Sequence, residues 1–365
     1  MKMNNFVLPI SIAMLMIFIS TAIAQESSKG STQAHKSKIK VFIVQSYEVD
    51  HVCGSPQGEG IEESLVKEFK DRIEIKNHFM STKTINSTPE KMKKEALVVL
   101  EEVASFQPDI VFTVDDDAFR EVGLQLTAQS YPVVFSGMNA QPEKYSERIP
   151  FLDGNGQPNA NVTGVYEKLH FQTALNVMRG VIPDLRKVVA LLDKSPTGNA
   201  IRIQLEKELA GYSEKVDVDF KQVGTMKEYL NEITSINNDL TVQAVYPVVL
   251  SVVDDQGMSV GFKKTLRAYI ANSTKPGMAL NFDFARLGLF GGASVDFGAM
   301  GRQTGEMGVK LLKGVAIGEL PVEVAKEYLI TFNKINAEML HIQIPEELIG
   351  AALIYDSIPL LSDTK

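Results

Sequence analysis

The chain has 365 residues, of which 44% are hydrophobic and 22% are charged, with a formal net charge of -8. This length is enough for two domains with their own hydrophobic cores, and the composition is that of an ordinary globular protein. The negative charge disfavours a nucleic-acid-binding surface, because such surfaces carry an excess of lysine and arginine.

The N-terminus predicts an export signal. Lys2 precedes the apolar run 6–19, and an Ala-x-Ala pattern ends at Ala24. The run is shorter than the roughly 20 apolar residues that a membrane-spanning helix needs. We therefore predict a signal peptide over residues 1–24, cleaved after Ala24, and a flexible leader over residues 25–37.

The cysteine content points to the same compartment. Cys53 is the only cysteine, so an internal disulfide is impossible, and it lies too far from Ala24 to be a lipid anchor. We expect a soluble, monomeric periplasmic protein in which Cys53 is an inert thiol.

From residue 38 the hydrophobic pattern alternates between strands and helices. Such alternation is typical of a parallel sheet with helices on both faces. In this first part we predict strands at 38–46, 73–81, 109–114 and 131–137, and helices at 58–72, 87–106 and about 118–129.

A segment rich in Pro, Gly and Asn, residues 139–160, interrupts the alternation, which then restarts. The second part predicts strands at 187–193, 216–223, 242–250 and 276–282, and helices at 171–182, 198–215, 227–236 and 261–273. After residues 291–297, a helix at 300–314 and a strand at 326–332 are expected to cross back to the first part and the hinge.

The predicted fold class is therefore α/β, with two doubly wound parallel-sheet lobes. We expect residues 38–162 and about 296–325 to form the first lobe. Residues 163–295 and about 326–352 would form the second lobe and the hinge, and residues 353–365 a C-terminal tail.

Ligands of open parallel sheets bind beyond the carboxyl ends of the strands. In both predicted lobes these positions carry hydrogen-bonding side chains and carboxylates, which suits a small polar molecule held between the lobes. The candidate ligand-binding residues are Ser46, Tyr47, Asp50, Asp115, Asp116, Asp117, Ser136, Gly137, Asn139, Thr163, Gly164, Ser195, Thr197, Asp255, Asn281 and Asp283.

The three consecutive aspartates after the strand at 109–114 have more than one interpretation. Asp116 or Asp117 could cap the following helix, because a carboxylate there accepts free backbone N–H groups. We expect one aspartate to do this and at least one other to face a ligand. The bound group would be an ammonium or sugar-like hydroxyls.

Enzymatic alternatives find less support in the sequence. Asp115 and Asp117 resemble the start of a haloacid-dehalogenase phosphatase, but Ala118 and Phe119 replace the Gly-Thr or Gly-Val that should follow. The five histidines show no paired metal-binding spacing, and no phosphate loop or serine-hydrolase elbow is present. We predict no catalysis, no metal and no cofactor.

Several stretches resemble a known family. "YPVVFSGMN", "NVTGVYE", "GRQTGEMGVKLLKG", "LPVE" and "FNKINAEMLHIQIPEELIGAA" are similar to ABC-transporter substrate-binding proteins of the periplasmic binding protein type I fold, above all the tryptophan- and tyrosine-type binders and related sensor domains. The resemblance spans about Lys38 to Ala352. It implies two lobes, three hinge crossovers, closure around a ligand and delivery to an ABC permease with its ATPase.

Two departures keep a second function open. "VDDDAF" and the loop "SYEVDHVCGSPQGEG" differ from the transport members and are more similar to sensor-type relatives. The favoured ligand is an amino acid or a related amine-bearing metabolite. The alternative is a ligand-sensing partner of a separate membrane histidine kinase or cyclase, and a hydrolase that uses the aspartates is a third hypothesis.

Overall fold

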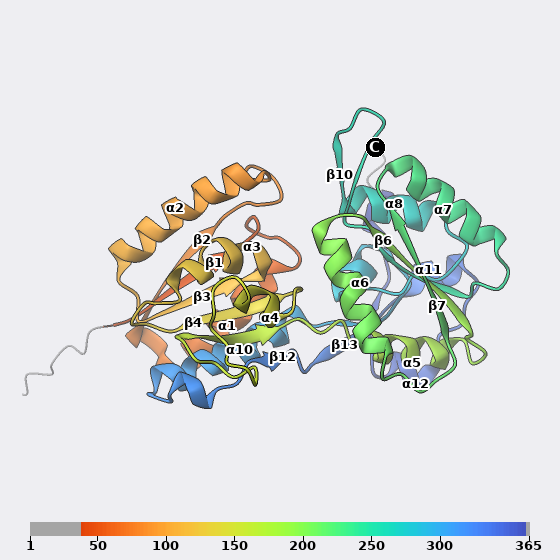
Figure 1. Cartoon of the computed structure of the whole chain (residues 1–365). Helices are drawn as coiled ribbons and strands as arrows, with labels where there is room; N and C mark the ends of the chain where they lie inside the picture. Colours follow the sequence, from red (N-terminus) through yellow and green to blue (C-terminus); the bar gives the residue numbers. More distant parts are fainter. Residues whose placement is uncertain (1–37, 363–365) are drawn as a thin grey trace, which may run out of the picture. The chain divides into compact units, whose positions relative to one another are not determined.

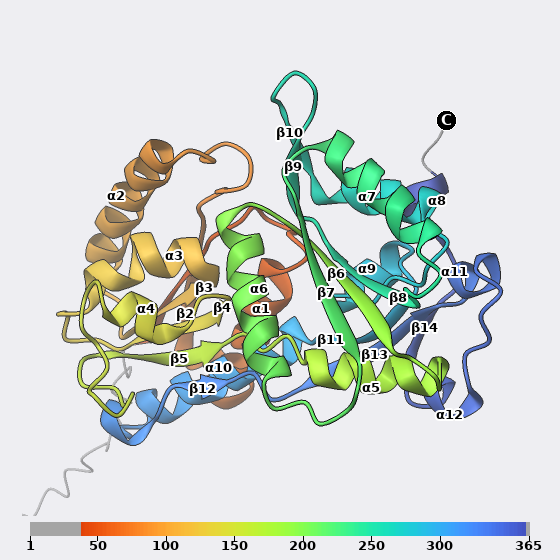
Figure 2. The ribbon, with the colours of Figure 1, turned by 45° about the vertical axis from the view of Figure 1, so that its right-hand side comes forward.

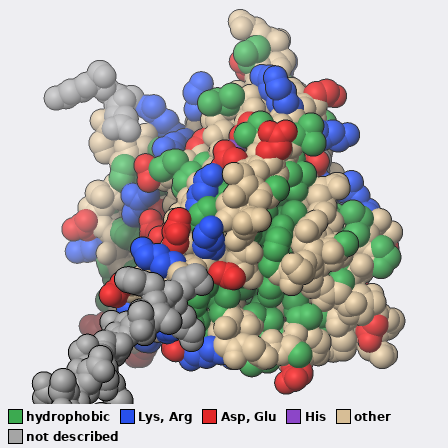
Figure 3. Space-filling model, turned by 90° about the vertical axis from the view of Figure 1, so that its left-hand side faces the viewer, with side chains coloured by type: hydrophobic (Ala, Val, Ile, Leu, Met, Phe, Trp, Pro, Cys, Tyr) green, Lys and Arg blue, Asp and Glu red, His purple; other side chains and the backbone are tan. Residues whose placement is uncertain are grey.

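The structure, a computed structural model, describes residues 38–362, so the predicted signal peptide and leader lie outside the described residues. Two α/β halves follow one another along the chain (Figure 1). Within the described part, every helix is too short or too polar to span a bilayer. On the face in Figure 3, basic and acidic side chains are intermingled.

The first half contains a six-stranded sheet in the order β12-β5-β4-β3-β1-β2. All its pairings are parallel, as the strand–helix alternation predicts. The strands are β1 (Ile39–Gln45), β2 (Ile73–Phe79), β3 (Ile110–Val114), β4 (Val133–Met138), β5 (Val162–Tyr166) and β12 (Glu323–Val324).

Helices cover both faces of this sheet because side chains alternate along each strand. In β1, Val41 and Ile43 pack into the cluster that contains α1 and α10, whereas Phe42 and Val44 pack with α2 and α3. The helices of this half are α1 (Gly54–Phe69), α2 (Pro89–Phe106), α3 (Asp115–Glu121), α4 (Pro142–Ser146) and α10 (Phe297–Leu312).

Close packing of α10 on α1 explains the glycine-rich motif of residues 300–314. A Cβ atom on Gly301 would clash with the backbone of Gln57, and one on Gly305 would clash with that of Ile61. Only glycine lets the two helix backbones approach so closely, and α10 thereby returns to the first half although it follows the second half in sequence.

The second half holds two short sheets, β7-β6-β8 and β11-β13-β14. Isolated bridges through Gly277 and Met278 join β8 to β11, where the sequence predicts a complete strand at 276–282. The β11–β13 pair is antiparallel. The strands are β6 (Lys187–Asp193), β7 (Asp217–Val223), β8 (Ala244–Val248), β11 (Gly291–Val295), β13 (Tyr328–Asn333) and β14 (Leu353–Tyr355).

A hairpin of β9 (Ser251–Val253) and β10 (Ser259–Gly261) stands out from this half (Figure 2). Three-residue strands give no usable periodicity, and the sequence predicts only a loop there. The helices are α5 (Phe171–Val181), α6 (Pro196–Leu209), α7 (Met226–Asn238), α8 (Phe262–Asn272), α9 (Phe282–Leu287), α11 (Lys334–Met339), α12 (Glu346–Ile349) and α13 (Pro359–Ser362).

The chain passes between the halves three times, after β5, after β11 and after β12. The expected division after residue 162 falls inside β5, which pairs with β4 through Tyr166. The expected C-terminal tail also differs, because β14 joins the sheet and Leu360 of α13 is buried. Both differences arise because strand pairing and burial, not local composition, fix these limits.

Candidate functional site

The three aspartates at the end of β3 have three different environments. Asp115 is 1% exposed and adopts a left-handed backbone with φ 67°. One of its carboxylate oxygens, Oδ1, accepts a hydrogen bond from Gln57 Nε2 at 3.4 Å, and the other, Oδ2, has no partner. Burial raises the pKa of Asp115 well above its usual range, and the neighbouring Asp116 carboxylate adds to the rise.

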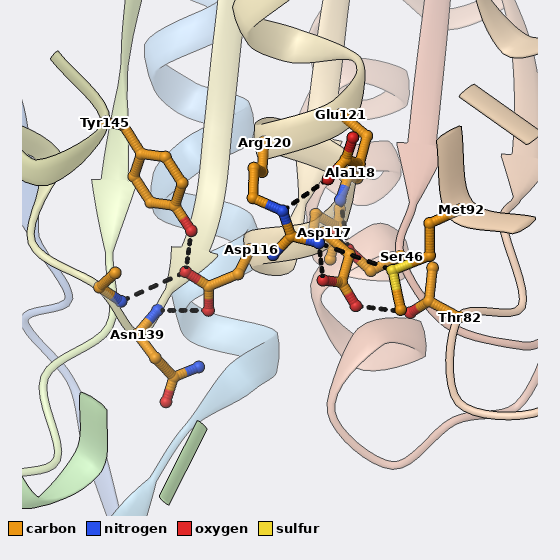
Figure 4. A network of polar contacts seen from close by, with 12 residues as sticks. Ser46, Thr82, Met92, Asp116, Asp117, Ala118, Arg120, Glu121, Asn139 and Tyr145 are labelled. Carbon is orange, nitrogen blue, oxygen red and sulfur yellow. Dashed lines mark hydrogen bonds and ion pairs between the residues drawn. The ribbon is translucent and has the colours of Figure 1, made fainter. Parts of the chain in front are cut away.

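Asp116 fixes the loop after β4 (Figure 4). Its carboxylate accepts hydrogen bonds from the backbone N–H groups of Asn139 at 3.0 Å and Ala140 at 3.3 Å, and from the Tyr145 hydroxyl at 2.5 Å. These three donors satisfy most of its acceptor capacity, so its main role is to position Asn139 and α4.

Asp117 turns toward the loop after β2 and toward Arg120 of its own helix (Figure 4). It accepts hydrogen bonds from the Thr82 hydroxyl at 2.7 Å and from Arg120 Nη2 at 2.6 Å. The prediction that Asp116 or Asp117 caps α3 is therefore wrong. Ser46, at the end of the neighbouring strand β1, accepts the N–H of Ala118 instead.

A network of hydrogen-bonded polar side chains lies next to Asp115. Gln57 of α1 donates to the Cys53 carbonyl at 3.0 Å and accepts from the Ser136 hydroxyl at 2.8 Å. Gly137 has φ 72°, and any Cβ there would collide with the Gln57 amide. The predicted residues Ser136 and Gly137 thus hold Gln57 in place, and Gln57 orients Asp115.

The loop between β1 and α1 carries an aromatic pair. The rings of Tyr47 and His51 lie 4.2 Å apart, and Lys83 Nζ lies 5.0 Å from the centre of the Tyr47 ring. Burial, followed by the charges of Lys83 and Lys263, lowers the pKa of His51 to about 4. The loop also contains Asp50, which is exposed at a left-handed turn with φ 64°.

Two predicted residues of the second half lie at the start of α9. Asn281 caps the helix by accepting the Phe284 N–H at 3.3 Å, and its Nδ2 lies 3.8 Å from the Cys53 sulfur. This contact links the β1–α1 loop of the first half to the second half. Asp283 is 4% exposed and forms an ion pair with Arg286.

Cys53 does not have the surroundings of a nucleophile. Burial raises the pKa of its thiol, and the carboxylates of Asp115, Glu167 and Asp283 raise it further. A buried thiol next to acids stays protonated and weakly reactive. Among the described residues, no group of three or more His, Cys, Asp or Glu side chains could hold a metal ion.

The remaining predicted residues lie elsewhere. Ser195 caps α6 by accepting the Gly198 N–H at 3.1 Å, and Thr197 lies in the first turn of that helix. Asp255 is exposed at the tip of the β9–β10 hairpin. Thr163 lies within β5 and donates to the Leu320 carbonyl at 2.9 Å, and Gly164 packs against the Phe135 backbone.

Three buried polar residues near the site are absent from the sequence prediction. Gln45 is the last residue of β1, and its Oε1 has no hydrogen-bond partner. Gln57 lies in the first turn of α1, which begins four residues earlier than predicted. Glu167 is the first residue after β5. The strand-end rule would have selected Gln45 and Glu167 if the strand limits had been known.

A groove of about 340 Å³ lies beside the crossover that follows β5. None of the sixteen predicted ligand-binding residues lines it, and neither does Glu167. Its lining comprises Gln141, Tyr166, Lys168, His170, Gln172, Thr173, Gln204, Lys207, Glu208, Gly211 and Val324.

Comparison with known proteins agrees on the family and fold. A family model described as ABC transporter substrate binding protein matches residues 55–354. A tyrosine-binding protein of Clostridioides difficile (strain R20291) is 22% identical over 287 residues, which cover 76% of this chain and 74% of that protein.

Two solved structures share the fold. An ABC domain from Streptococcus pneumonia in complex with L-Trp has a TM-score of 0.63 and 21% identity, covering 88% of this chain and all of that one. A ligand-free, open substrate binding protein with adhesive properties from Clostridium difficile has a TM-score of 0.66 and 16% identity, covering 87% of this chain and 99% of that one.

Proposed function

Because the chain belongs to the ABC transporter substrate binding protein family, we propose that it is an exported solute receptor. It captures one small polar molecule at the strand ends and delivers it to an ABC permease. Members of this family bind solutes and are not enzymes. The favoured ligand is an amino acid or a related amine-bearing metabolite.

The unpartnered Oδ2 of Asp115 is the observation that carries this ligand class. A buried acceptor without a donor costs free energy, and a ligand that brings an N–H or O–H donor removes that cost. An ammonium group supplies both the donors and the charge that a buried carboxylate needs. Asp115 also lies at the carboxyl end of a parallel strand, where this fold class binds ligands.

The ligands of two relatives support the same class. One relative is named for tyrosine, and one solved structure contains L-Trp, and both molecules carry an ammonium group. The Tyr47–His51 ring pair would pack against an apolar part of such a molecule.

Closure of the two halves around a ligand requires ligand contacts that exist only in the closed arrangement. Asp115 comes from the first half and Asn281 from the second, and the Cys53–Asn281 contact already joins their loops. We propose that ligand binding strengthens this junction and that a permease recognises the joined form. The receptor would act as a monomer in the periplasm, in keeping with the export signal predicted over residues 1–24.

A thermal-shift screen of residues 25–365 tests this function. The protein is unfolded and refolded first to remove any retained ligand. It is then heated with amino acids, amines, nucleosides and sugars in the presence of an extrinsic dye, because the chain has no tryptophan. A ligand at about a hundredfold excess over its dissociation constant adds about 2.7 kcal/mol of stability.

The expected result is a shift with an unaltered amine-bearing solute, and its absence in Asp115→Asn. A shift with sugars or nucleosides alone would contradict the ligand class, and turnover of the solute would contradict the receptor function. Delivery is tested by uptake of the labelled ligand in a deletion strain. Unchanged uptake would favour the sensing alternative.

A further inference from the structure

Glu167 is a buried acid without a stabilising partner. It is 2% exposed, and its main chain is fixed on both sides: its N–H donates to the Met138 carbonyl at 3.0 Å, and its carbonyl accepts from Gln204 Nε2 at 2.7 Å. Among the described residues, its carboxylate feels burial and the charges of other acids but has no hydrogen-bond or ion-pair partner. The backbone thus holds an unpaired carboxylate on a side chain that keeps little contact with solvent.

The sheet places Glu167 near Asp115. The strands β5, β4 and β3 are consecutive neighbours, and their carboxyl ends lie at one edge. Two strand spacings amount to about 10 Å between backbones, which leaves room for a small group between the two side chains. In agreement, burial raises the pKa of Glu167, and the carboxylates of Asp115 and Asp116 raise it further.

The nearby charges leave these two acids uncompensated. Asp117 is paired with Arg120, and Asp283 is paired with Arg286. Lys83 and Lys263 are the cations that affect this region from the two halves, but both are exposed and therefore screened by water. Burial of a carboxylate without a paired cation favours its neutral form, and a positive group that arrives beside it favours the charged form.

Two buried acceptor atoms without hydrogen-bond partners indicate which ligand group would bind here. Gln45 Oε1 and Asp115 Oδ2 both lack partners, and they lie 3.5 Å and 3.8 Å from the point where a Cβ on Gly54 would be. Both atoms need a donor, and the absent side chain of Gly54 leaves space beside them. A primary ammonium has three N–H donors, whereas a quaternary ammonium has none.

We infer that Glu167 is a ligand-binding residue that acts with Asp115, and that the pair selects ligands whose buried end is a primary ammonium group. This inference rests on the proposed receptor function and deepens it. The ammonium donates to both carboxylates and to Gln45 Oε1. The carboxyl groups ionise on binding and release their protons to the solvent, so binding weakens as the pH falls.

Titration calorimetry with matched variants tests the inference. The probe is whichever of L-tyrosine, L-lysine and 1,4-diaminobutane shifts the melting temperature most, together with its N-trimethyl derivative. The variants are Glu167→Gln, Asp115→Asn and Gly54→Ala, and Asp71→Asn is the control because it removes the same charge at an exposed position shortly after α1. Titrations in phosphate and in Tris give the number of protons released.

We expect Glu167→Gln and Asp115→Asn each to weaken binding by about tenfold or more and to reduce proton release, since a charge-assisted hydrogen bond is lost. Gly54→Ala, which meets only ordinary contacts, should fold and weaken binding by occupying the ammonium position. The trimethyl derivative should bind at least about tenfold less tightly. Asp71→Asn should bind as the unaltered protein does.

Two outcomes separate this inference from the proposed function. If Glu167→Gln and Gly54→Ala bind the amine with unchanged affinity while Asp115→Asn does not, the receptor function stands and the role of Glu167 is refuted. Equal binding of the trimethyl derivative refutes the primary-ammonium preference. If no solute of any class binds the refolded protein, both the function and the inference fail.

Discussion

The hydroxyl of Ser46 accepts the backbone N–H of Ala118 at 2.8 Å and donates to the Val114 carbonyl at 2.7 Å. One fully buried side chain just after β1 thereby closes the junction between β3 and α3. Because Ser46 takes over the capping, the aspartates of the same turn are free for other partners.

We therefore predict that Ser46→Ala destabilises the protein by about 1–3 kcal/mol, because it leaves a buried N–H without an acceptor. Urea unfolding followed by circular dichroism measures the change. Ser235→Ala, at an exposed position of α7, is the matched control and should have no effect. Equal stability of both variants would show that Ser46 does not cap α3.

The second prediction concerns the pH dependence of Asp115. Its folded-state pKa is raised, so its contribution to stability is fully present below the unfolded pKa of about 3.9 and is lost as the pH rises through the folded pKa. Asp115→Asn imitates the neutral acid and tolerates the left-handed backbone. The compared quantity is the melting temperature of ligand-free Asp115→Asn minus that of the ligand-free unaltered chain. This difference should increase between pH 5 and pH 8, by the standard linkage relation. A constant difference would contradict this.

The third prediction concerns His170 in the crossover after β5. Burial, followed by the charge of Lys168, lowers the pKa of His170 to about 4, and its ring lies 5.3 Å from that of Tyr328, the first residue of β13. A depressed histidine pKa gives stability that is present above about pH 6.5 and lost as the pH falls toward 4.

His170→Asn should lack this acid-dependent loss, since asparagine also accepts the left-handed φ of 53°. Melting temperatures from pH 7 to pH 4 measure the effect. His341→Asn is the control because His341 also has a positive φ but is exposed. The same pH profile for His170→Asn and the unaltered protein would refute a role of His170 in the acid sensitivity of the hinge.

The fourth prediction concerns the contact between α1 and α10. Gly301→Ala places a methyl group against the Gln57 backbone, so one helix must move, at a cost of about 1–3 kcal/mol. Because Gln57 also orients Asp115, ligand affinity should fall as well. Gly298→Ala in the same helix meets only side-chain atoms at ordinary distance and should be neutral or stabilising. Similar stability of the two variants would refute the close packing.

The sequence predicts the main elements because their hydrophobic periodicity is strong. The strand at 187–193 and the helix at 171–182 match β6 and α5 within one residue. The β9–β10 hairpin escapes prediction, since three-residue strands leave no period to detect, and the strand predicted at 276–282 is reduced to isolated bridges.

At the site, composition identifies the kinds of residue but not their partners. The three consecutive aspartates indicate a polar strand end. In the structure, Asp116 positions a loop and Asp117 pairs with Arg120. Of the three, only Asp115 has a carboxylate oxygen without a partner. Side-chain direction within one helical turn decides this division, and only the neighbouring strands and helices fix that direction.

The sequence by itself determines the α/β class and the family and predicts an export signal, because these depend on local periodicity and on motifs that are contiguous in the chain. The tertiary structure alone decides that Glu167, Asp115 and Gln45 lie at one edge. Those three residues come from the ends of β5, β3 and β1, and parallel pairing brings them together although 122 positions separate Gln45 from Glu167 (167 − 45). Their burial without a cation is a property of that assembly, because desolvation depends on everything that packs around a carboxylate.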